Sequence, residues 1–579
     1  MAFSVCQKNG IKLAMYVGAS KIKTIKRGTL QSEELRRGEM RTILKNARCY
    51  TLDQNQTVAE AILMEDGKIA AIGSNEEILD MAAAEDTIID AEGKTVLPGF
   101  YDSHLHLLSY GYSLTMAYLD DCKSIEDVIA TLKQYIKDNN IPPGTWVEGR
   151  GWNETNYPEG RVPNRHDLDR VSTEHMISIG RSCSFMCITN TKALEELGFL
   201  DKIPDVEVGS IELDEQGVPT GVFVSEAKEA VYARLPKLGV EKIKKSIIAA
   251  CNKYKTAGIT SAETDDFELT RAGDFHDIIQ AYQELDAAGE LPIRVNLMLY
   301  LPEDEQQQEF YKYGFKTGDG SDFFRIGKFK LLTDGPLGIR GAAMLEPYAD
   351  DPSTLGQQEI SQEALCRKVK DAYEHGLITV CDGMGDRGIY MALKAYEPIV
   401  KAHPDEDLRF GIDHSQITTE GLIEEYARLK VTGGCELVFV KSDIEITEKR
   451  VGRHRASLSY NWKRFFDNGC VVSAGSDSPV EDFNPMLGID GAVNRRDWDN
   501  LPKEGWFTEQ CLTVEQAVSA FTTGAAYANY EEKVKGSLEV GKLADMVILS
   551  DNIFEIDKNH VADVKVEKTI LNGEVVYSI

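Results

Sequence analysis

The sequence contains no apolar run long enough to cross a membrane. A spanning helix needs roughly 20 consecutive apolar residues, and no stretch of the 579 residues approaches this. The amino-terminal stretch is interrupted by Lys8 and Lys12 and lacks the continuous apolar segment of a secretory signal. We therefore expect a cytoplasmic protein with no membrane partner.

Positive charge is scarce. The chain has 64 Lys and Arg residues against 94 Asp and Glu residues, which gives a formal net charge of −30. A surface of this sign repels phosphate backbones and anionic membranes. Nucleic acid is therefore not an expected partner, and a small-molecule substrate is.

The cysteines form no regular framework. There are 11 of them, without any C-x-x-C pair, and the nearest two are Cys183 and Cys187. An odd number of scattered cysteines in a long chain is typical of reduced, mostly buried thiols. This argues against both a disulfide scaffold and a zinc ribbon.

Both ends of the chain have the alternation of β-strands, and the chain is too long for one compact core. Asp66-Gly67 and Asn572-Gly573 are typical hairpin turns, each flanked by alternating apolar residues. We predict that residues 40–97 and 535–579 form one small β-sandwich built from both termini.

The middle of the chain alternates apolar strands with amphipathic helices, which favours a parallel sheet. The strand candidates lie near residues 96–103, 257–263, 292–301, 325–333, 378–382, 409–413, 430–440 and 470–476. Eight such units predict an α/β fold, a (β/α)₈ TIM-type barrel over residues 98–534. The first gap is too long for one crossover, so we predict an inserted subdomain at about 120–245.

The clearest chemical signal is LPGFYDSHLH, which ends at His104 and His106. Residues two apart in a strand point the same way, so both imidazoles can bind one ion at the carboxyl end of the first barrel strand. Neutral imidazole suits zinc and similar divalent metals. Because the chain has only 10 histidines, we interpret this pair as metal ligands rather than ordinary strand residues.

Three other predicted strands end in polar side chains where the barrel mouth should lie. They are Lys330 in KLLTDG, His414 in GIDH and Asp477 in AGSDSP. Singly, each has a structural explanation: an ion pair, a core histidine or a helix cap. Their recurrence at three strand ends favours one shared site, because barrel chemistry gathers at this face.

Several longer motifs occur in a fixed order from about residue 40 to residue 579. They are LPGFYDSHLH, NRHDLDRV, TNTKALEELGF, GVPTGVF, KLLTDGPLGIRGAAMLEPY, GDRGIYMALKAYE, DHSQI, AGSDSPVEDFNPMLGI and GSLEVGKLADMVIL. Together they resemble the amidohydrolase superfamily, specifically amidohydrolase family 3, the branch of YtcJ-like and N-substituted formamide deformylase-like proteins. The resemblance implies a metal-dependent hydrolase acting on a non-peptide C–N bond, with one or two divalent ions. Zinc is expected first, manganese is an alternative, and relatives suggest a homodimer.

The resemblance also implies roles for individual residues. His104 and His106 would bind the first metal with Asp477, and His414 would bind a second. Lys330 would have to be neutral or carboxylated to serve as a ligand, since an ammonium group cannot ligate a cation; the carboxylated form would bridge the two metals. Asp477 would take the proton from a metal-activated water and pass it to the leaving amine.

Asp382 departs from the family pattern. The family has H-A-I-G-D-R at the end of the fifth strand, whereas this chain has Asp382-Gly383-Met384-Gly385-Asp386-Arg387. Carboxylate oxygen also ligates zinc or manganese, so Asp382 is a candidate ligand of a two-metal site. Alternatively the second site is lost and one metal remains.

Two further residues are candidates for substrate contact. Phe185 stands where many relatives have a histidine, five residues before Asn190, which predicts a more apolar pocket; packing of Phe185 in the core is the competing interpretation. Arg340, in GIRGAA, has the charge to bind a substrate carboxylate, but an anchoring role in its loop is equally consistent.

Three functions remain open at this stage. The leading hypothesis is hydrolysis of an N-substituted formamide, an amide or a similar C–N bond. A cyclic-amide hydrolase or a deaminase on the same scaffold is the second. The third is a catalytically weak homologue that binds a metabolite and serves regulation. This hypothesis stays open because Asp382 replaces the histidine of the family pattern.

Residues 1–39 fit poorly with the rest of the chain. They are basic (KIKTIKRG, ELRRGEM), have no clear apolar period and precede a well-patterned strand from Arg41. Arg-Gly-Glu before Met40 can be encoded by a purine-rich, ribosome-binding-like run. We expect either a disordered extension or a mis-called start, with Met40 as the natural first residue. Mass spectrometry of the natively expressed protein tests this, and a product that retains residues 1–39 would contradict the second possibility.

Overall fold

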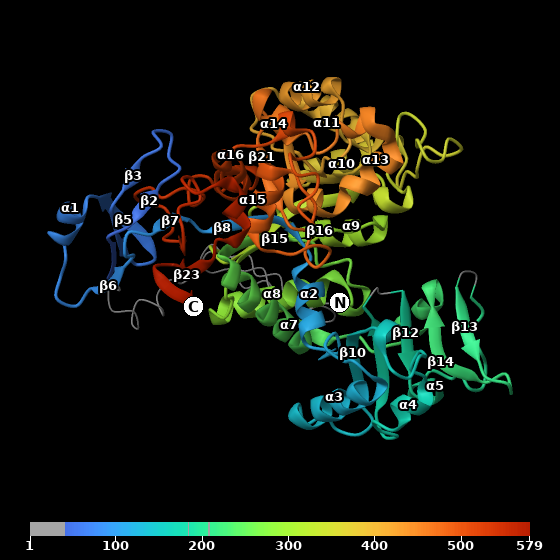
Figure 1. Ribbon diagram of the computed structural model, residues 1–579. Coiled ribbons are helices and arrows are strands. Elements are labelled where there is room, and N and C mark those ends of the chain that lie inside the picture. Colours follow the sequence, from blue (N-terminus) through green and yellow to red (C-terminus); the bar gives the residue numbers. More distant parts are fainter. Residues whose placement is uncertain (1–40, 183–184, 207–208) are drawn as a thin grey trace, which may run out of the picture.

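The computed structural model describes residues 41–182, 185–206 and 209–579. The prediction for residues 1–39 therefore lies outside the described residues. At the centre is an eight-stranded parallel sheet in the order β21-β20-β19-β18-β17-β16-β15-β8 (Figure 1). Its strands are β8 (Phe100–Leu105), β15 (Ile259–Thr264), β16 (Arg294–Tyr300), β17 (Phe324–Leu332), β18 (Thr379–Gly383), β19 (Gly411–His414), β20 (Thr432–Glu436) and β21 (Val472–Gly475).

The last strand returns to the first and closes the sheet. The backbone N–H of Asp477 donates to the carbonyl of His104 at 2.8 Å, and that of His106 donates to Ser478 at 2.8 Å. The predicted (β/α)₈ TIM-type barrel is thus confirmed, with all strands parallel and their carboxyl ends at one mouth.

The eight predicted strands are all present, with two differences in extent. The first candidate divides at Gly99, because β7 (Thr95–Pro98) belongs to a terminal sheet and only β8 enters the barrel. The seventh is shorter than predicted: β20 ends at Glu436, and the apolar residues after it form a helical turn, Leu437–Phe439. A strand that is buried on both faces has a near-continuous apolar sequence. The apolar helical turn that follows β20 lengthens this apolar run, so the sequence predicts a longer strand.

Helices cover the outside of the barrel. They are α2 (Leu107–Leu114), α7 (Gly239–Tyr254), α8 (Phe275–Ala288), α9 (Asp304–Tyr311), α10 (Gln362–Glu374), α11 (Asp386–Ala402), α12 (Glu420–Leu429), α13 (Val440–Ala456), α14 (Trp462–Asp467) and α15 (Pro485–Asn494). Helix α8 illustrates how they form. The Asp274 side chain caps its first turn, Gly289 ends it with φ 69°, and Ile278, Tyr282 and Leu285 are buried.

Both chain termini contribute to a β-sandwich at one side of the barrel, the blue and red strands of Figure 1. One sheet has the order β5-β4-β1-β6 and the other β24-β23-β22-β7-β2-β3. The strands are β1 (Arg41–Lys45), β2 (Arg48–Tyr50), β3 (Val58–Ala59), β4 (Ala61–Glu65), β5 (Lys68–Gly73), β6 (Thr87–Asp90), β7, β22 (Met546–Leu549), β23 (Val566–Leu571) and β24 (Glu574–Ser578). Both predicted hairpin turns are present, and all four turn residues have positive φ, as type I′ turns require.

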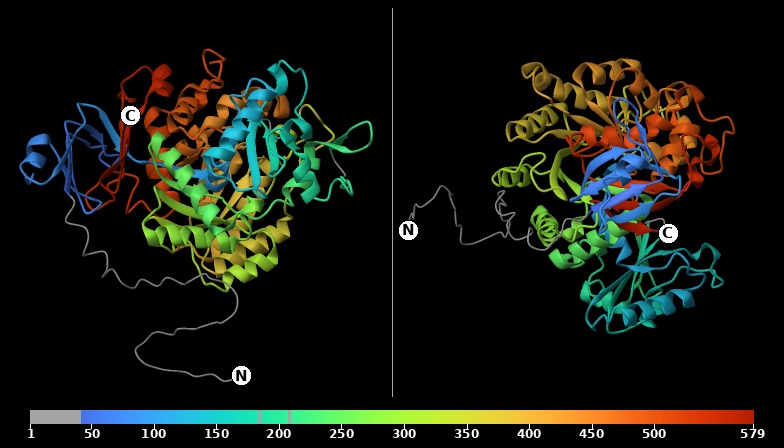
Figure 2. Two further views of the ribbon diagram at one scale, coloured as in Figure 1. Left: turned by 90° about the horizontal axis from the view of Figure 1, so that it is seen from below. Right: turned by 90° about the vertical axis from the view of Figure 1, so that its left-hand side faces the viewer.

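An inserted subdomain comes after α2 and lies on a different side of the barrel from the sandwich (Figure 2). Its sheet has the order β13-β14-β12-β11-β10-β9. The strands are β9 (Ala117–Tyr118), β10 (Trp146–Trp152), β11 (Met176–Arg181), β12 (Met186–Thr189), β13 (Ser210–Leu213) and β14 (Pro219–Val224), and helices α3 (Ile125–Asp138), α4 (Arg165–Asp169) and α5 (Thr191–Glu196) accompany them.

Among the described residues, no helix is long and apolar enough to cross a membrane.

A buried ion pair joins the barrel to the C-terminal strands. Arg294, the first residue of β16, donates from Nε to Asp545 at 2.7 Å and from Nη2 to the same carboxylate at 2.9 Å. The two side chains are 2% and 4% exposed. Removing one partner of such a pair leaves a buried charge uncompensated.

We therefore expect Asp545→Ala to destabilise the protein by about 3–5 kcal/mol, measured as a lower midpoint of urea unfolding. The matched control is Asp467→Ala, which removes the exposed pair with Lys463 (38% and 53% exposed) and should cost below about 1 kcal/mol. Equal midpoints for the two variants would contradict the linking role of Arg294 and Asp545.

Candidate metal centre

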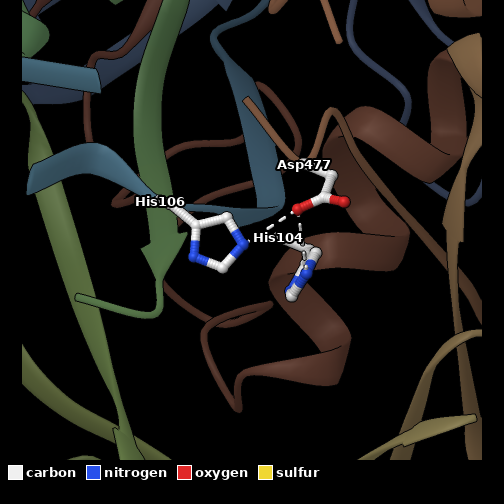
Figure 3. A group of neighbouring side chains, drawn as sticks. All are labelled: His104, His106 and Asp477. Atoms are coloured by element: carbon white, nitrogen blue, oxygen red, sulfur yellow. Dashed lines mark hydrogen bonds and ion pairs between the residues drawn. The ribbon is translucent and has the colours of Figure 1, made fainter. Parts of the chain in front are cut away.

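Two histidines and an aspartate converge where the barrel closes. His104 lies near the end of β8, and His106 precedes the first turn of α2. His106 Nε2 is 2.9 Å from Asp477 Oδ1, and His104 Nε2 is 3.5 Å from the same oxygen (Figure 3). One ligand atom of each residue lies within 4.8 Å of the other two, as binding of one ion requires.

The backbone after β21 holds Asp477 in place. Asp477 has φ 57°, in the left-handed region, and its N–H is bonded to His104. Gly475 permits this close approach, because a Cβ there would stand 2.8 Å from the backbone nitrogen of His104. Any larger residue at position 475 would push the first and last strands apart.

A second group of ligands shares His104 with the first. His104, Asp382 and His414 each offer one atom within 4.8 Å of the others. His414 Nε2 is 3.8 Å from Asp382 Oδ2, and the rings of His104 and His414 are 5.1 Å apart. The carboxylate of Asp382 therefore lies near the end of β18 and beside His414, and its role as a ligand stays a prediction.

Each histidine is oriented through its other ring nitrogen. His104 Nδ1 is 3.2 Å from Asp413, and His414 Nδ1 is 2.9 Å from Glu436. His106 Nδ1 lies 3.0 Å from the backbone carbonyl of Asp265. With a carboxylate or carbonyl oxygen beside each Nδ1, the Nε2 atoms lie next to the carboxylates of Asp477 and Asp382, an arrangement that is usual around a protein-bound metal.

Lys330 is buried among carboxylates. Its Nζ is 3.0 Å from Asp265, 3.2 Å from Asp382 and 3.9 Å from Glu268. Burial lowers the pKa of Lys330, but the charges of Asp382 and Asp265 outweigh it and raise the pKa above its ordinary value. As an ammonium group Lys330 neutralises these carboxylates and cannot ligate, so carboxylation stays a prediction.

The charge of the cluster fits a divalent cation. Asp382 Oδ1 is buried and has no hydrogen-bond partner among the described residues, which is unusual for a buried carboxylate. Burial lowers the pKa of His414, yet Glu436 and Asp382 outweigh it and raise the pKa to about 9. Without a cation, protons on histidine balance the carboxylates, and a divalent metal would take their place.

Sequence reasoning missed four acidic residues of this centre: Asp265, Glu268, Asp413 and Glu436. Asp265 comes directly after β15 and Glu436 ends β20, so the strand-end rule could have found both. Asp265 and Glu268 also form a third group with His106, with ligand atoms within 4.8 Å. Asp413 was harder to predict. Neighbours in a strand point to opposite faces, so placing His414 in the site implied that Asp413 points away from it. The positive φ of His414, 66°, breaks that alternation.

The two candidate substrate residues lie in different settings. Phe185, directly before β12, is 62% exposed, so the interpretation that it packs in the core is wrong. Arg340 binds Asp350 at 2.9 Å, and Arg450 binds the same carboxylate. Arg340 thus has the loop-anchoring contact, and substrate contact by either residue stays a prediction.

The sequence pattern of the amidohydrolase family matches residues 87–577. The chain is 30% identical over 540 residues to YtcJ of Bacillus subtilis, a protein named as an amidohydrolase, covering 93% of this chain and 99% of that one. It is 24% identical to N-substituted formamide deformylase of Arthrobacter pascens, over 92% of this chain and 97% of that one. The crystal structure of an uncharacterised metal-dependent hydrolase from Pyrococcus furiosus superposes with a TM-score of 0.73 at 26% identity, over 89% of this chain and 100% of that one. This protein therefore belongs to the amidohydrolase family.

The ligand geometry predicts about two ions per chain, measured by elemental analysis of protein expressed with zinc or manganese and bicarbonate. Asp382→Ala should lose about one of them, and Asp382→His, which introduces the family's histidine, should keep both. Asp386→Asn is the matched control, since Asp386 instead accepts from the backbone N–H of Leu345 at 2.7 Å. About one ion in both wild type and Asp382→Ala would show that Asp382 is no ligand.

Proposed function

We propose that this protein hydrolyses a non-peptide C–N bond in a small amide, with an N-substituted formamide as the first substrate class to test. The observation that carries the proposal is the convergence of His104, His106 and Asp477 at the barrel mouth. The similarity to N-substituted formamide deformylase over 92% of this chain supports the choice of substrate. Similarity of fold alone would not, because one fold serves many chemistries.

A divalent metal at this centre would lower the pKa of water towards neutrality and polarise the scissile carbonyl. The chain would hold it through Nε2 of His104 and His106 and through Asp477, with Asp382 and His414 as ligands of a second ion. The carboxylates of Asp413 and Glu436 orient the rings and stay out of the reaction.

Asp477 is placed to move the proton. Its Oδ1 faces the two imidazoles, while Oδ2 forms no hydrogen bond with any residue that the structure describes. Burial raises the pKa of Asp477, but the hydrogen bonds from His104 and His106 outweigh it and hold the pKa well below the ordinary value. Asp477 is thus ionised at neutral pH in the metal-free site, and a bound cation would favour the same carboxylate form, which would accept a proton from the attacking water and return it to the leaving amine.

Two alternatives differ in their chemistry. A cyclic-amide hydrolase or a deaminase would use the same centre on a different C–N bond. A metabolite-binding regulatory homologue would retain the fold and lose turnover, with Asp382 as the altered ligand. Metal content and turnover together separate these possibilities.

Asp477→Asn should lower the rate of formamide hydrolysis by about 10²–10⁴-fold, measured as release of formate. Metal content should be kept, because the amide oxygen of asparagine can still ligate. Asp482→Asn is the matched control: Asp482 is a nearby aspartate that accepts from the backbone N–H of Asn484 at 2.8 Å, and its replacement should leave the rate within about twofold. A metal-loaded wild type without activity on any amide would leave the regulatory homologue as the better hypothesis.

A further inference from the structure

A cavity of about 400 Å³ lies between the barrel mouth and the inserted subdomain. The barrel contributes α2 and the residues Leu269 and Pro479 to its wall, and the subdomain contributes β10 and β11. Leu269 stands directly after Glu268, and Pro479 stands two residues after Asp477. The cavity wall therefore includes residues that neighbour Glu268 and Asp477 in sequence, and its volume suits a small organic group.

The pairing of β10 with β11 explains why this space is open. Glu148 and Arg150 alternate with buried residues of β10, so both side chains leave the same face of the sheet. Their partners on β11 are Ser178 and Gly180. A Cβ added at Gly180 would meet only Tyr232 Oη, at 3.5 Å, so small neighbours leave room beside the arginine.

Most charges of the cavity wall are already paired. Arg271 binds Glu148, which also accepts a hydrogen bond from Tyr112 and lies 3.8 Å from Lys242. Arg181 binds Glu154 at 2.8 Å, and Lys228 lies 3.8 Å from Glu229. Each of these cations thus has a carboxylate partner within the protein.

Arg150 is different. It forms no ion pair with any residue that the structure describes, and its Nε is buried without a hydrogen-bond partner among them. The carboxylate of Asp120, on the same wall, lies against the backbone of Gly151 and makes no ion pair with Arg150; a Cβ on that glycine would be 2.1 Å from Asp120 Oδ2. A guanidinium without an ion-pair partner among the described residues is suited to a carboxylate, which it can bind through two parallel hydrogen bonds.

We infer that this cavity holds the end of the substrate remote from the scissile bond, and that this end carries a carboxylate bound by Arg150. The inference rests on the proposed function and narrows it to amides that bear an acidic group. A cationic or neutral end would leave the Arg150 guanidinium desolvated without a counter-charge, which is unfavourable.

Three formamides test this, each with a six-carbon chain on the amide nitrogen that ends in a carboxylate, a carboxamide or an amine. Wild type should hydrolyse the carboxylate with kcat/KM about 10- to 100-fold above the carboxamide, as expected for hydrogen bonds to a charged group. Arg150→Met should abolish that preference, because KM for the carboxylate rises while the carboxamide no longer has to desolvate a guanidinium. Gly180→Leu, which fills the cavity without removing charge, should weaken hydrolysis of the carboxylate as well.

The matched control is Arg170→Met, an arginine of the same subdomain whose side chain is 52% exposed and pairs with Glu126; it should retain the wild-type preference. Preference of wild type for the amine or the carboxamide would overturn the inference. Retention of the carboxylate preference by Arg150→Met would overturn it too.

A binding measurement separates this inference from the proposed function. Hexanoate and hexanamide are titrated by calorimetry into metal-loaded wild type and Arg150→Met, where any contact with the metal is common to both proteins. Tighter binding of hexanoate that is lost in Arg150→Met supports the subsite even if no formamide is hydrolysed, and the proposed function then fails alone. Equal binding of hexanoate by the two proteins would overturn the subsite whatever the turnover shows.

Discussion

The structure depends on the contact between the first and last strands of the barrel. The hydrogen bond from Asp477 to the carbonyl of His104 brings together residues far apart in sequence, and the imidazole of His106 then meets a carboxylate 371 positions away. Closing so long a loop costs conformational entropy, which the packed barrel must offset. The grouping of the candidate metal ligands is therefore a property of the closed barrel rather than of any local motif.

Inside the barrel, charge takes the place of some of the aliphatic packing that is common in this fold. Lys330 is surrounded by Asp265 and Asp382, and Lys328 lies 3.5 Å from Glu263, which also accepts from Asn529 at 2.8 Å. Burying ions costs hydration free energy, and their mutual attraction only partly offsets that cost. The ionic interior is therefore better explained by the chemistry it supports than by a gain in stability.

The sequence allowed prediction of the elements and of those candidate ligands that lie at strand ends. Eight apolar runs and two Asp-Gly or Asn-Gly turns were enough for the barrel and the sandwich, because periodicity and turn chemistry are local. His104, His106, Lys330, His414 and Asp477 were predicted from position. Asp413 was not predicted, because the positive φ of His414 breaks the alternation of side chains in that strand. Arg150 was not predicted either, because its surroundings depend on which strand of the inserted subdomain pairs with β10.

The sandwich built from both termini has a consequence for the order of folding. Strand β7 leads directly into β8, which carries His104, and β7 is paired on one side with β22 from the far end of the chain. During synthesis the amino-terminal half of this sheet has an unpaired edge until β22 has left the ribosome. Completion of the scaffold behind the first candidate ligands is thus linked to synthesis of β22, and a product terminated before Met546 would lack that support.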